Sequence, residues 1–319
     1  MDGAKILIIH QGAIGDFILS LPALQTIQNS FPGRLIEMLG YPAILSLAGS
    51  SFAATIRSAD WAAASTLYGD FDDVTEQIRQ YLAGFERLFF FSAGRSSAFT
   101  HNVQRCNPAA VHLRTFPDSA QHVVDFQLAQ LPGLGLTPAG FVPQLRVSPA
   151  DRSRADQYLL THACAVSPYP LIAVHPGSGG RHKCWPTQSF VSVMHRLHEE
   201  RHAGFLIVQG PADEKTAGNL KAGLAGLPCA LLAHLDLPLV AAILSQSALF
   251  IGNDSGITHM AAALGIPTVA VFGPTDPAVW APRGKSVSIV RSFDPVGQWL
   301  WPEPEQVLES ARMLLAVDK

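Results

Sequence analysis

The chain has 319 residues, of which 48% are hydrophobic and 15% are charged, and its formal net charge is −3. This length suits two domains of about 150 residues each, and the apolar content excludes a disordered chain. The acidic and basic residues are balanced in both halves, which excludes a dedicated nucleic-acid-binding module.

The cysteines and the N-terminus indicate the compartment. Cys106, Cys164, Cys184 and Cys229 show no C-x-x-C spacing, which favours a reducing cytosol over a disulfide scaffold or a zinc knuckle. The start "MDGAKILIIHQG" lacks the basic beginning and cleavable apolar core of a signal peptide. No stretch reaches the roughly 18 uninterrupted apolar residues of a membrane span. We therefore expect a cytoplasmic protein.

Strand-like apolar runs alternate with helix-like stretches in the first half of the chain. The predicted strands are 4–10, 34–40 and 87–93. The predicted helices are Asp16–Ser30, whose apolar residues recur at helical spacing, 118–136 up to a Pro-Gly break, and 148–160, which opens with a serine N-cap and a proline.

The second half repeats this alternation after a proline-containing connector at 166–170. Its predicted strands are 171–177, 205–214, 247–256 and 268–277, and its last predicted helix is 304–318. The pattern predicts an α/β protein with two doubly wound parallel sheets, an N-terminal domain over 1–165 and a C-terminal domain over 166–319. Ligands bind such sheets at the carboxyl ends of the strands, so we expect the active site in a cleft between the domains.

Three short motifs have ordinary structural explanations. "HEERH" (198–202) matches the zinc-protease pattern, but His198 and His202 lie off the apolar face of their helix, which favours a solvated helix end. "DFD" (70–72) resembles the metal-binding D-x-D of some sugar transferases, yet capping of the next helix explains it. "HQGAIG" lacks the dinucleotide-binding G-x-G-x-x-G and leaves a turn whose N–H groups can approach a ligand.

The stretch "HPGSGGRHKCWP" (175–186) predicts a diphosphate cradle. Small residues follow a strand there and let backbone and hydroxyl donors approach a phosphate, while Arg181 and Lys183 add positive charge. The Walker signature is missing, and an ordinary surface loop is the alternative.

The stretch 250–277 carries the strongest local signal. A strand ends in Asn253, Asp254, Ser255 and Gly256, where a helix of small residues begins with N–H groups able to bind an anion. His259 lies one turn further on the same face as Ser255. Capping by Asp254 or Ser255 explains one polar residue but not the whole group, so we interpret it as a binding site.

The order and spacing of these motifs resemble glycosyltransferase family 9, the ADP-heptose:lipopolysaccharide heptosyltransferases. The resemblance runs over nearly the whole chain, from "ILIIHQGAIGDFILSLPAL" to "FIGNDSGITHMAAALGIPTVAVFGPTDP". It implies a GT-B fold, with two Rossmann-like domains facing a cleft, the donor nucleotide bound by the C-terminal domain and the acceptor by the N-terminal one. It also implies inverting transfer without a metal or other cofactor, from ADP-heptose to a lipid-linked inner-core acceptor at the inner membrane surface.

The resemblance also implies roles for particular residues. Asp16 matches the general base, which a helix N-terminus would keep ionised, and Lys183 stabilises the departing diphosphate. Glu214 lies near the ribose position, and the backbone around Leu235 matches the adenine contact. The donor-side residues are Ser178, Gly179, Lys183, Glu214, Leu235, Asp254, Ser255, Gly256, Ile257 and His259. The acceptor-side residues are His10, Gly12, Ala13 and Gly15, and His10 stands where many members have arginine, which leaves the acceptor group open.

Two alternatives stay open. One is a transferase of the same fold that moves another sugar onto another surface glycan, and the other is a nucleotide-sugar-binding protein without turnover, against which Asp16 and Lys183 together argue. We expect a monomer that binds no nucleic acid and touches the inner leaflet without spanning it. Besides the acceptor itself, the candidate contacts with the membrane surface are Arg57, Arg79, Arg87, Arg95, Arg105 and Arg114, although most suit a solvated surface.

Overall fold

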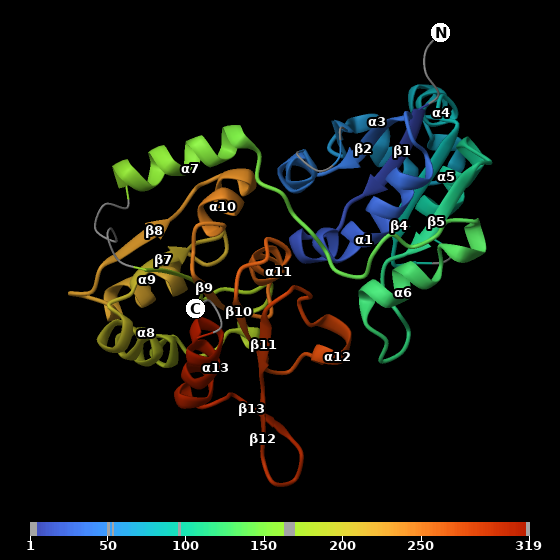
Figure 1. Ribbon diagram of the computed structural model, residues 1–319. Helices are drawn as coiled ribbons and strands as arrows, with labels where there is room; N and C mark the ends of the chain where they lie inside the picture. The colour runs from blue at the N-terminus through green and yellow to red at the C-terminus, as the bar shows by residue number, and fades with distance from the viewer. Residues whose placement is uncertain (1–4, 50–51, 53, 95–96, 163–169, 317–319) are drawn as a thin grey trace. The chain divides into compact units, whose positions relative to one another are not determined.

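The computed structural model describes residues 5–49, 52, 54–94, 97–162 and 170–316. The chain divides into two compact units, Met1–Pro143 and Gln144–Lys319. Figure 1 labels their elements and shows that each unit is built on its own sheet with helices packed around it. Among the described residues, no helix is both long enough and apolar enough to cross a bilayer.

The N-terminal unit contains a parallel five-stranded sheet in the order β3-β2-β1-β4-β5. Its strands are β1 (Lys5–His10), β2 (Leu35–Gly40), β3 (Ala54–Ser58), β4 (Arg87–Ser92) and β5 (Ala110–Arg114). Its α-helices are α1 (Ile14–Ser30), α2 (Pro42–Leu45), α3 (Ala62–Ser65), α4 (Glu76–Ala83), α5 (Ala98–Cys106) and α6 (Val123–Ala129). Its 3-10 helices are η1 (Ser46–Ala48), η2 (Thr66–Tyr68), η3 (Phe71–Asp73) and η4 (Pro132–Leu134).

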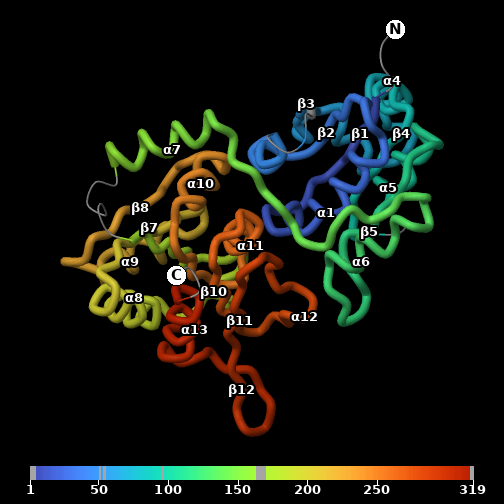
Figure 2. The backbone as a smooth tube through the Cα atoms, viewed as in Figure 1, coloured from blue at the N-terminus to red at the C-terminus, as the bar shows by residue number. Residues whose placement is uncertain are grey.

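The C-terminal unit contains a parallel six-stranded sheet in the order β11-β10-β9-β6-β7-β8. Its strands are β6 (Leu171–His175), β7 (Gly204–Val208), β8 (Cys229–Leu232), β9 (Leu249–Asn253), β10 (Thr268–Val271) and β11 (Val287–Val290). Its helices are α7 (Pro149–His162), η6 (Arg181–Lys183), α8 (Thr187–Arg201), α9 (Glu214–Gly223), α10 (Leu237–Leu244), α11 (Gly256–Ala263), α12 (Pro277–Trp280) and α13 (Pro304–Ala316). A hairpin of β12 (Ser292–Phe293) and β13 (Trp299–Leu300) extends from this unit, as Figure 2 shows.

The two parallel sheets confirm the predicted α/β architecture. The middle strands are almost wholly apolar and buried, as in β1, where Ile6, Leu7, Ile8 and Ile9 are at most 1% exposed. Strands covered on both faces by helices bury side chains of both orientations, so a continuous apolar run replaces the alternation of a half-exposed strand. The large cores on either side of each sheet follow from that pattern.

The domain boundary differs from the expected one. The position expected between residues 165 and 166 lies outside the described residues, and the units divide after Pro143. Helix α7 packs against α10 within the C-terminal unit, and Arg154 of α7 makes an ion pair with Asp236 at the start of α10. The segment 144–162 therefore belongs to the C-terminal unit.

Two helices have other bounds than the sequence predicts. Helix α1 begins at Ile14, so Asp16 lies inside its first turn. The helix expected over 118–136 is limited to α6, because the His122 side chain caps its start by accepting a hydrogen bond from the Val124 N–H, and Pro132 begins a separate 3-10 turn. The serine N-cap predicted for α7 is confirmed, since Ser148 Oγ accepts a hydrogen bond from the Asp151 N–H.

The close approach of β1 and β2 gives a test of the N-terminal sheet. A Cβ atom on Gly40 would lie 2.0 Å from the main-chain oxygen of His10. Because this backbone oxygen cannot move without disturbing the strand pair, we expect Gly40→Ala to lower the free energy of unfolding by at least about 1–3 kcal/mol. Gly140→Ala is the control, since a Cβ there meets nothing within 4 Å. Equal urea midpoints for the two variants would contradict this account.

Candidate active site

The polar residues singled out in the sequence form two groups, one in each unit. The first follows β1 in the N-terminal unit, and the second follows β6, β7 and β9 in the C-terminal unit. These positions are the carboxyl ends of parallel strands, where the next helices begin with their N–H groups.

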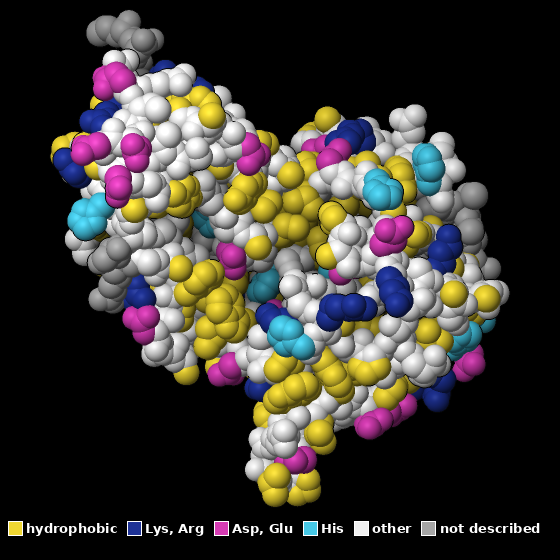
Figure 3. All heavy atoms as spheres, turned by 180° about the vertical axis from the view of Figure 1, so that it is seen from behind, with side chains coloured by type: hydrophobic (Ala, Val, Ile, Leu, Met, Phe, Trp, Pro, Cys, Tyr) yellow, Lys and Arg dark blue, Asp and Glu magenta, His cyan; other side chains and the backbone are white. Residues whose placement is uncertain are grey.

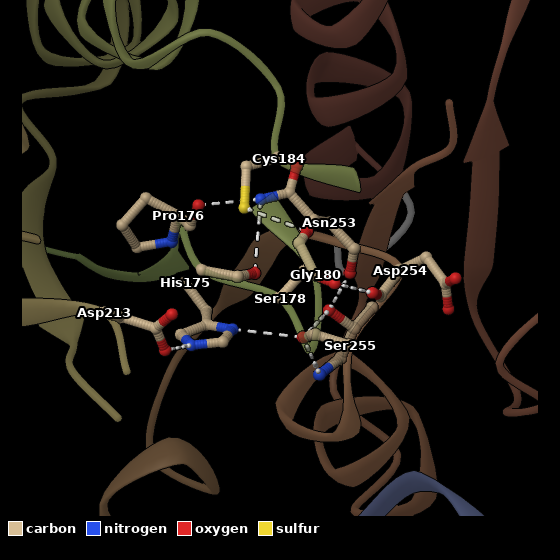
Figure 4. Close-up of polar contacts among 11 residues, drawn as sticks. His175, Pro176, Ser178, Gly180, Cys184, Asp213, Asn253, Asp254 and Ser255 are labelled. Atoms are coloured by element: carbon tan, nitrogen blue, oxygen red, sulfur yellow. Dashed lines mark hydrogen bonds and ion pairs between the residues drawn. The ribbon is translucent and has the colours of Figure 1, made fainter. Parts of the chain in front are cut away.

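Asn253, the last residue of β9, holds the loop after β6 in place. Its side chain is fully buried, and its Nδ2 donates to the carbonyl oxygens of Pro176 and Gly177 at 2.8 and 3.2 Å. Its Oδ1 accepts a hydrogen bond from the Trp185 N–H at 2.9 Å, further along the same loop. One buried amide thus anchors both ends of the predicted diphosphate cradle to the neighbouring strand, and Figure 4 shows its contact with Pro176 at the first end.

His175, at the end of β6, joins two other elements through its ring nitrogens. Nδ1 lies 3.0 Å from Ser255 Oγ and Nε2 lies 3.0 Å from Asp213 Oδ2, and Figure 4 shows the three side chains in line. Burial would raise the pKa of Asp213, but the hydrogen bond and charge of His175 and a backbone hydrogen bond at Gly210 outweigh it and lower that pKa. A Cβ on Gly177 would lie 2.1 Å from Asp213 Cγ, so only glycine leaves room for this carboxylate.

The second carboxylate of the group, Asp254, is held by two other side chains. Lys183 Nζ lies 3.0 Å from Asp254 Oδ2, and Thr275 Oγ1 donates to the same oxygen at 2.8 Å. Ser178 Oγ donates to the main-chain oxygen of Asp254 at 2.6 Å. His259 Nε2 lies 4.0 Å from Asp254 Oδ1. The predicted donor residues Ser178, Lys183, Asp254 and His259 are therefore brought together.

The start of helix α11 completes this group. Ser255 is its N-cap residue, and its Oγ accepts a hydrogen bond from the Thr258 N–H. The next two N–H groups, of Gly256 and Ile257, belong to the first turn, where no intrahelical carbonyl is available to them. A positive helix end and the Lys183 ammonium thus lie around one point, which suits a phosphate-bearing ligand.

The remaining predicted donor residues lie further out on the same sheet edge. Gly179 is exposed, and a Cβ there would meet nothing within 4 Å, so the fold itself does not require glycine at this position. Glu214 is the exposed first residue of α9, next to the buried Asp213. Leu235 is half-buried in the loop between β8 and α10.

In the N-terminal unit, Asp16 lies at the third position of α1. Its Oδ2 accepts a hydrogen bond from the Ala13 N–H at 3.1 Å, so it closes the first turn as a capping residue does. A Cβ on Gly12 would lie 2.8 Å from Asp16 Cβ and 2.9 Å from His10 Cε1, which explains glycine at this position. Gly15 lies in the same half-exposed first turn.

His10, at the end of β1, is neutral at physiological pH. Its ring is 1% exposed and packs against Phe17 and Phe91, with centroids 5.3 Å away in each case, and burial lowers its pKa to about 4. Nδ1 accepts a hydrogen bond from the Gly12 N–H, so Nε2 carries the proton and donates to Ser20 Oγ at 3.1 Å. The ring therefore brings no positive charge to the acceptor side.

A cavity of about 320 Å³ lies within the N-terminal unit beside these residues. Asp16 lines it together with hydroxyl groups and aromatic rings from the ends of β4, η2 and α5. Its lining is His10, Gln11, Gly12, Asp16, Tyr68, Phe91, Ser92, Ala93, Gly94, Ser97, Phe99, Thr115 and Phe116. A carboxylate among hydroxyl and aromatic side chains suits a sugar, whose hydroxyl groups hydrogen-bond while its C–H faces pack on rings.

The two metal-like motifs have structural roles. His198 Nδ1 lies 2.8 Å from the Ala203 carbonyl oxygen, and His202 ends α8 with a φ of 52°. Asp72 lies in the separate 3-10 helix η3 (Phe71–Asp73), and Asp70 is the N-cap residue of that helix. "DFD" therefore does not cap α4, whose N-cap residue is Thr75. Within the described part of the chain, no three His, Cys, Asp or Glu side chains converge as metal ligands would.

Sequence reasoning missed several residues of both groups. His175, Asp213, Thr258 and Thr275 were not singled out, because each is an ordinary polar residue in sequence and gains its partners only in the fold. One sequence signal was available for His175 and Asp213. Each lies near the carboxyl end of a predicted strand, as Asn253 does. The cavity residues from β4, η2 and α5 had no such signal.

The comparisons with known proteins agree with one another. The profile of "Glycosyltransferase family 9 (heptosyltransferase)" matches residues 110–298, more than half of the chain. Lipooligosaccharide heptosyltransferase 2 of Haemophilus ducreyi is 25% identical over 313 residues, which are 91% of this chain and 89% of that protein. The structure of Escherichia coli ADP-heptose lps heptosyltransferase II matches at a TM-score of 0.78 and 20% identity, over 98% of this chain and 99% of that one. Escherichia coli heptosyltransferase WaaC with ADP matches at a TM-score of 0.71 and 18% identity, over 97% and 99%. These likenesses and the two parallel sheets confirm the GT-B fold.

The buried His10 predicts an acid limit to the stability of the N-terminal unit. An unfolded chain binds a proton on this ring below its ordinary pKa of about 6.5, whereas the folded chain does so only near 4, so stability is lost as the pH falls through this window. We expect a loss of up to about 3 kcal/mol. Hydrogen exchange of the β1 and α1 amides at several pH values measures it.

His10→Gln is the matched variant for that measurement, since it keeps polar atoms but cannot titrate. Its stability should change less than that of the wild type between about pH 6.5 and 4. Carboxylates with a lowered pKa, such as Asp213, take up protons only at lower pH, so they do not change the stability between about pH 6.5 and 4. An identical pH profile for both proteins would show that His10 is not the source.

Proposed function

The chain belongs to glycosyltransferase family 9, the heptosyltransferase family of lipopolysaccharide core synthesis, and from this premise we propose that it transfers heptose from ADP-heptose to an inner-core sugar. We propose further that the reaction inverts the anomeric configuration and needs no metal ion. The observation that carries this proposal is the group formed by Lys183, Asp254 and the N-terminus of α11 in the C-terminal unit.

This group suits the diphosphate of a nucleotide sugar. A related enzyme, Escherichia coli heptosyltransferase WaaC, has been solved with ADP, and a nucleoside diphosphate carries the charge that an ammonium and a helix N-terminus attract. In the structure Asp254 holds Lys183 in place, and the Lys183 side chain is 30% exposed. Negative charge that develops on the departing diphosphate would be stabilised by these fixed groups.

Asp16 is the proposed general base. Its carboxylate lines the cavity of the N-terminal unit and can accept the proton of an acceptor hydroxyl as the oxygen attacks the anomeric carbon of the donor. A single displacement of this kind inverts the configuration at that carbon. The hydrogen bond from the Ala13 N–H orients the carboxylate beside the cavity.

The acceptor is proposed to be lipid-linked and to be met at the inner face of the inner membrane. Figure 3 shows acidic and basic side chains interspersed on the face that it presents, not gathered into a basic patch. Several of the candidate arginines already have partners in the N-terminal unit, and Arg95 lies outside the described residues. Those with partners are Arg57 with Glu37, Arg79 with the Val74 and Phe71 carbonyls, Arg105 over the Phe71 ring and Arg114 with Asp118. We therefore propose contact mainly through the acceptor itself.

A transfer assay tests the proposal directly. Purified protein is incubated with ADP-heptose, or with UDP-glucose as the alternative donor, and with lipopolysaccharide truncated at the inner core. We expect a product one heptose heavier, formed from ADP-heptose alone and still formed in excess EDTA. Product from UDP-glucose would favour a same-fold transferase of another sugar. No product from either donor would favour a nucleotide-sugar-binding protein without turnover. Loss of product formation in EDTA would indicate a metal-dependent reaction.

Replacement of the base should separate chemistry from binding. We expect Asp16→Asn to lower kcat by about 10²–10⁴-fold with little change in donor affinity, because an amide still accepts the Ala13 hydrogen bond but cannot take up the proton. Asp72→Asn, an exposed carboxylate of η3, is the control and should keep wild-type activity. A wild-type rate for Asp16→Asn would refute its role, and a loss in Asp72→Asn would revive the metal interpretation of "DFD".

Removal of the ammonium should weaken diphosphate binding. We expect Lys183→Ala to raise the Kd for ADP by about 10- to 100-fold, as the loss of a charge-assisted contact of about 1.5–3 kcal/mol predicts, and to slow transfer as well. Lys221→Ala, on the exposed end of α9, is the control. Isothermal titration with ADP measures both, and an unchanged Kd for Lys183→Ala would place the diphosphate elsewhere.

A further inference from the structure

The chain of side chains Asp213–His175–Ser255 lies behind the proposed diphosphate site. The three residues come from different elements, the loop after β7, the end of β6 and the N-cap of α11, and they are 9%, 3% and 7% exposed. Two hydrogen bonds of 3.0 Å join them. Nothing in the transfer step described above uses His175 or Asp213.

The hydrogen bonds define where the protons lie when His175 is neutral. Asp213 is an ionised carboxylate that only accepts, so Nε2 of His175 carries a hydrogen and donates to it. Nδ1 then has a lone pair and accepts the hydroxyl hydrogen of Ser255. The Ser255 oxygen also accepts the Thr258 N–H as N-cap. In this state the single hydroxyl hydrogen of Ser255 points inward, away from a ligand.

A second proton on His175 reverses this arrangement. Nδ1–H then donates to Ser255 Oγ, and the hydroxyl hydrogen of Ser255 is released to turn towards the first turn of α11. The neighbouring Thr258 hydroxyl donates its own hydrogen to the Asn253 carbonyl oxygen at 2.5 Å, so it cannot act as the donor to an anion. Thr258 Oγ1 lies 3.1 Å from Ser255 Oγ and can accept the Ser255 hydrogen until a ligand binds. Protonation therefore adds one hydrogen-bond donor and one positive charge at the place where an anion would bind.

The other charged groups around His175 leave Asp213 as its direct partner. From the loop after β6, Lys183 is paired with Asp254 of the β9–α11 turn. Nε2 of His259, from α11, lies 4.0 Å from Asp254 Oδ1. Burial and the Asp213 charge raise the pKa of Cys184, so its thiol is neutral at physiological pH. An imidazolium at His175 would thus be compensated by the Asp213 carboxylate.

We propose that His175 and Asp213 are positioning residues that couple binding of the donor diphosphate to uptake of a proton. When the diphosphate binds at the start of α11, His175 takes up one proton from solvent, and Ser255 turns its hydroxyl to donate to a phosphate oxygen. The proton returns to solvent when the nucleoside diphosphate leaves. This inference rests on the proposed function, since it assumes that the diphosphate occupies this site.

Isothermal titration with ADP in buffers of different ionisation enthalpy, such as PIPES and Tris at about pH 7.5, tests the coupling. For the wild type we expect an observed enthalpy that depends on the buffer, with uptake of up to one proton per ADP. His175→Gln should bind ADP with a buffer-independent enthalpy. His195→Gln is the matched control, because it removes a histidine of α8 that lies outside this group, next to the Gly223 carbonyl oxygen, and it should keep the uptake.

Further variants keep the test decisive if His175→Gln does not fold. In Asp213→Asn, the pH range in which ADP binding is coupled to proton uptake should move down by about 1–3 units, because the protonated ring of His175 no longer has a carboxylate beside it. Ser255→Thr keeps a hydroxyl and should retain the pH dependence of the Kd, whereas Ser255→Ala should lose it. In transfer assays these changes should act on KM for the donor more than on kcat.

The outcomes distinguish this inference from the proposed function. Failure of the wild type to bind ADP would overturn the proposed function and, with it, this inference. ADP binding without proton uptake, or uptake that persists in His175→Gln or disappears in His195→Gln, would overturn the inference alone. Uptake that depends on His175 and shifts in Asp213→Asn would support it.

Discussion

The buried amide of Asn253 is the contact on which the C-terminal site depends. It lies at the end of a central strand and satisfies two carbonyl groups and one N–H of a loop about 70 residues earlier in the chain. Each buried backbone group left without a partner costs about 1–3 kcal/mol, so the loop has a strong preference for this one conformation. That conformation brings Lys183 and Ser178 to the start of α11.

The remainder of that site follows from how the loop lies. Its bend at Gly177 leaves room for the Asp213 carboxylate, and Asp213 in turn reaches His175 and, through it, Ser255. Polar groups from three strand ends are thereby satisfied by one another inside a low-dielectric interior, where such contacts are stronger than in water. The result is a rigid set of donors and charges that needs little rearrangement when an anion binds.

In the N-terminal unit, a single tight turn positions the Asp16 carboxylate. Gly12 allows the chain to turn tightly after β1, so the Asp16 carboxylate and the His10 ring share the space that a side chain would fill. The neutral, buried ring supports the turn through the Gly12 N–H and Ser20. The carboxylate then lies at the wall of a cavity lined by hydroxyl and aromatic groups, an arrangement suited to a sugar hydroxyl.

Much of the architecture could be read from the sequence alone because buried parallel strands are continuous apolar runs. Within the two parallel sheets, the strands that the sequence did not reveal are the edge strands β3, β5, β8 and β11. An edge strand is partly exposed, as β8 and β11 are, and these two are only four residues long, with a serine inside β11. The helix 149–162 looked like the end of the first domain because packing against α10, not its own sequence, decides which unit it joins.

Some features of the candidate site could likewise be predicted from the sequence, and others could not. The sequence by itself determined the family and the glycine-rich strand ends, since close backbone approach and helix starts have local signatures. Only the tertiary structure decided that Asp213, next to the predicted Glu214, is the buried carboxylate, and that it reaches His175 and Ser255. Asp213 and Ser255 lie 38 and 80 positions after His175 in the chain. The ends of parallel strands bring such positions together without leaving any pattern in the local sequence.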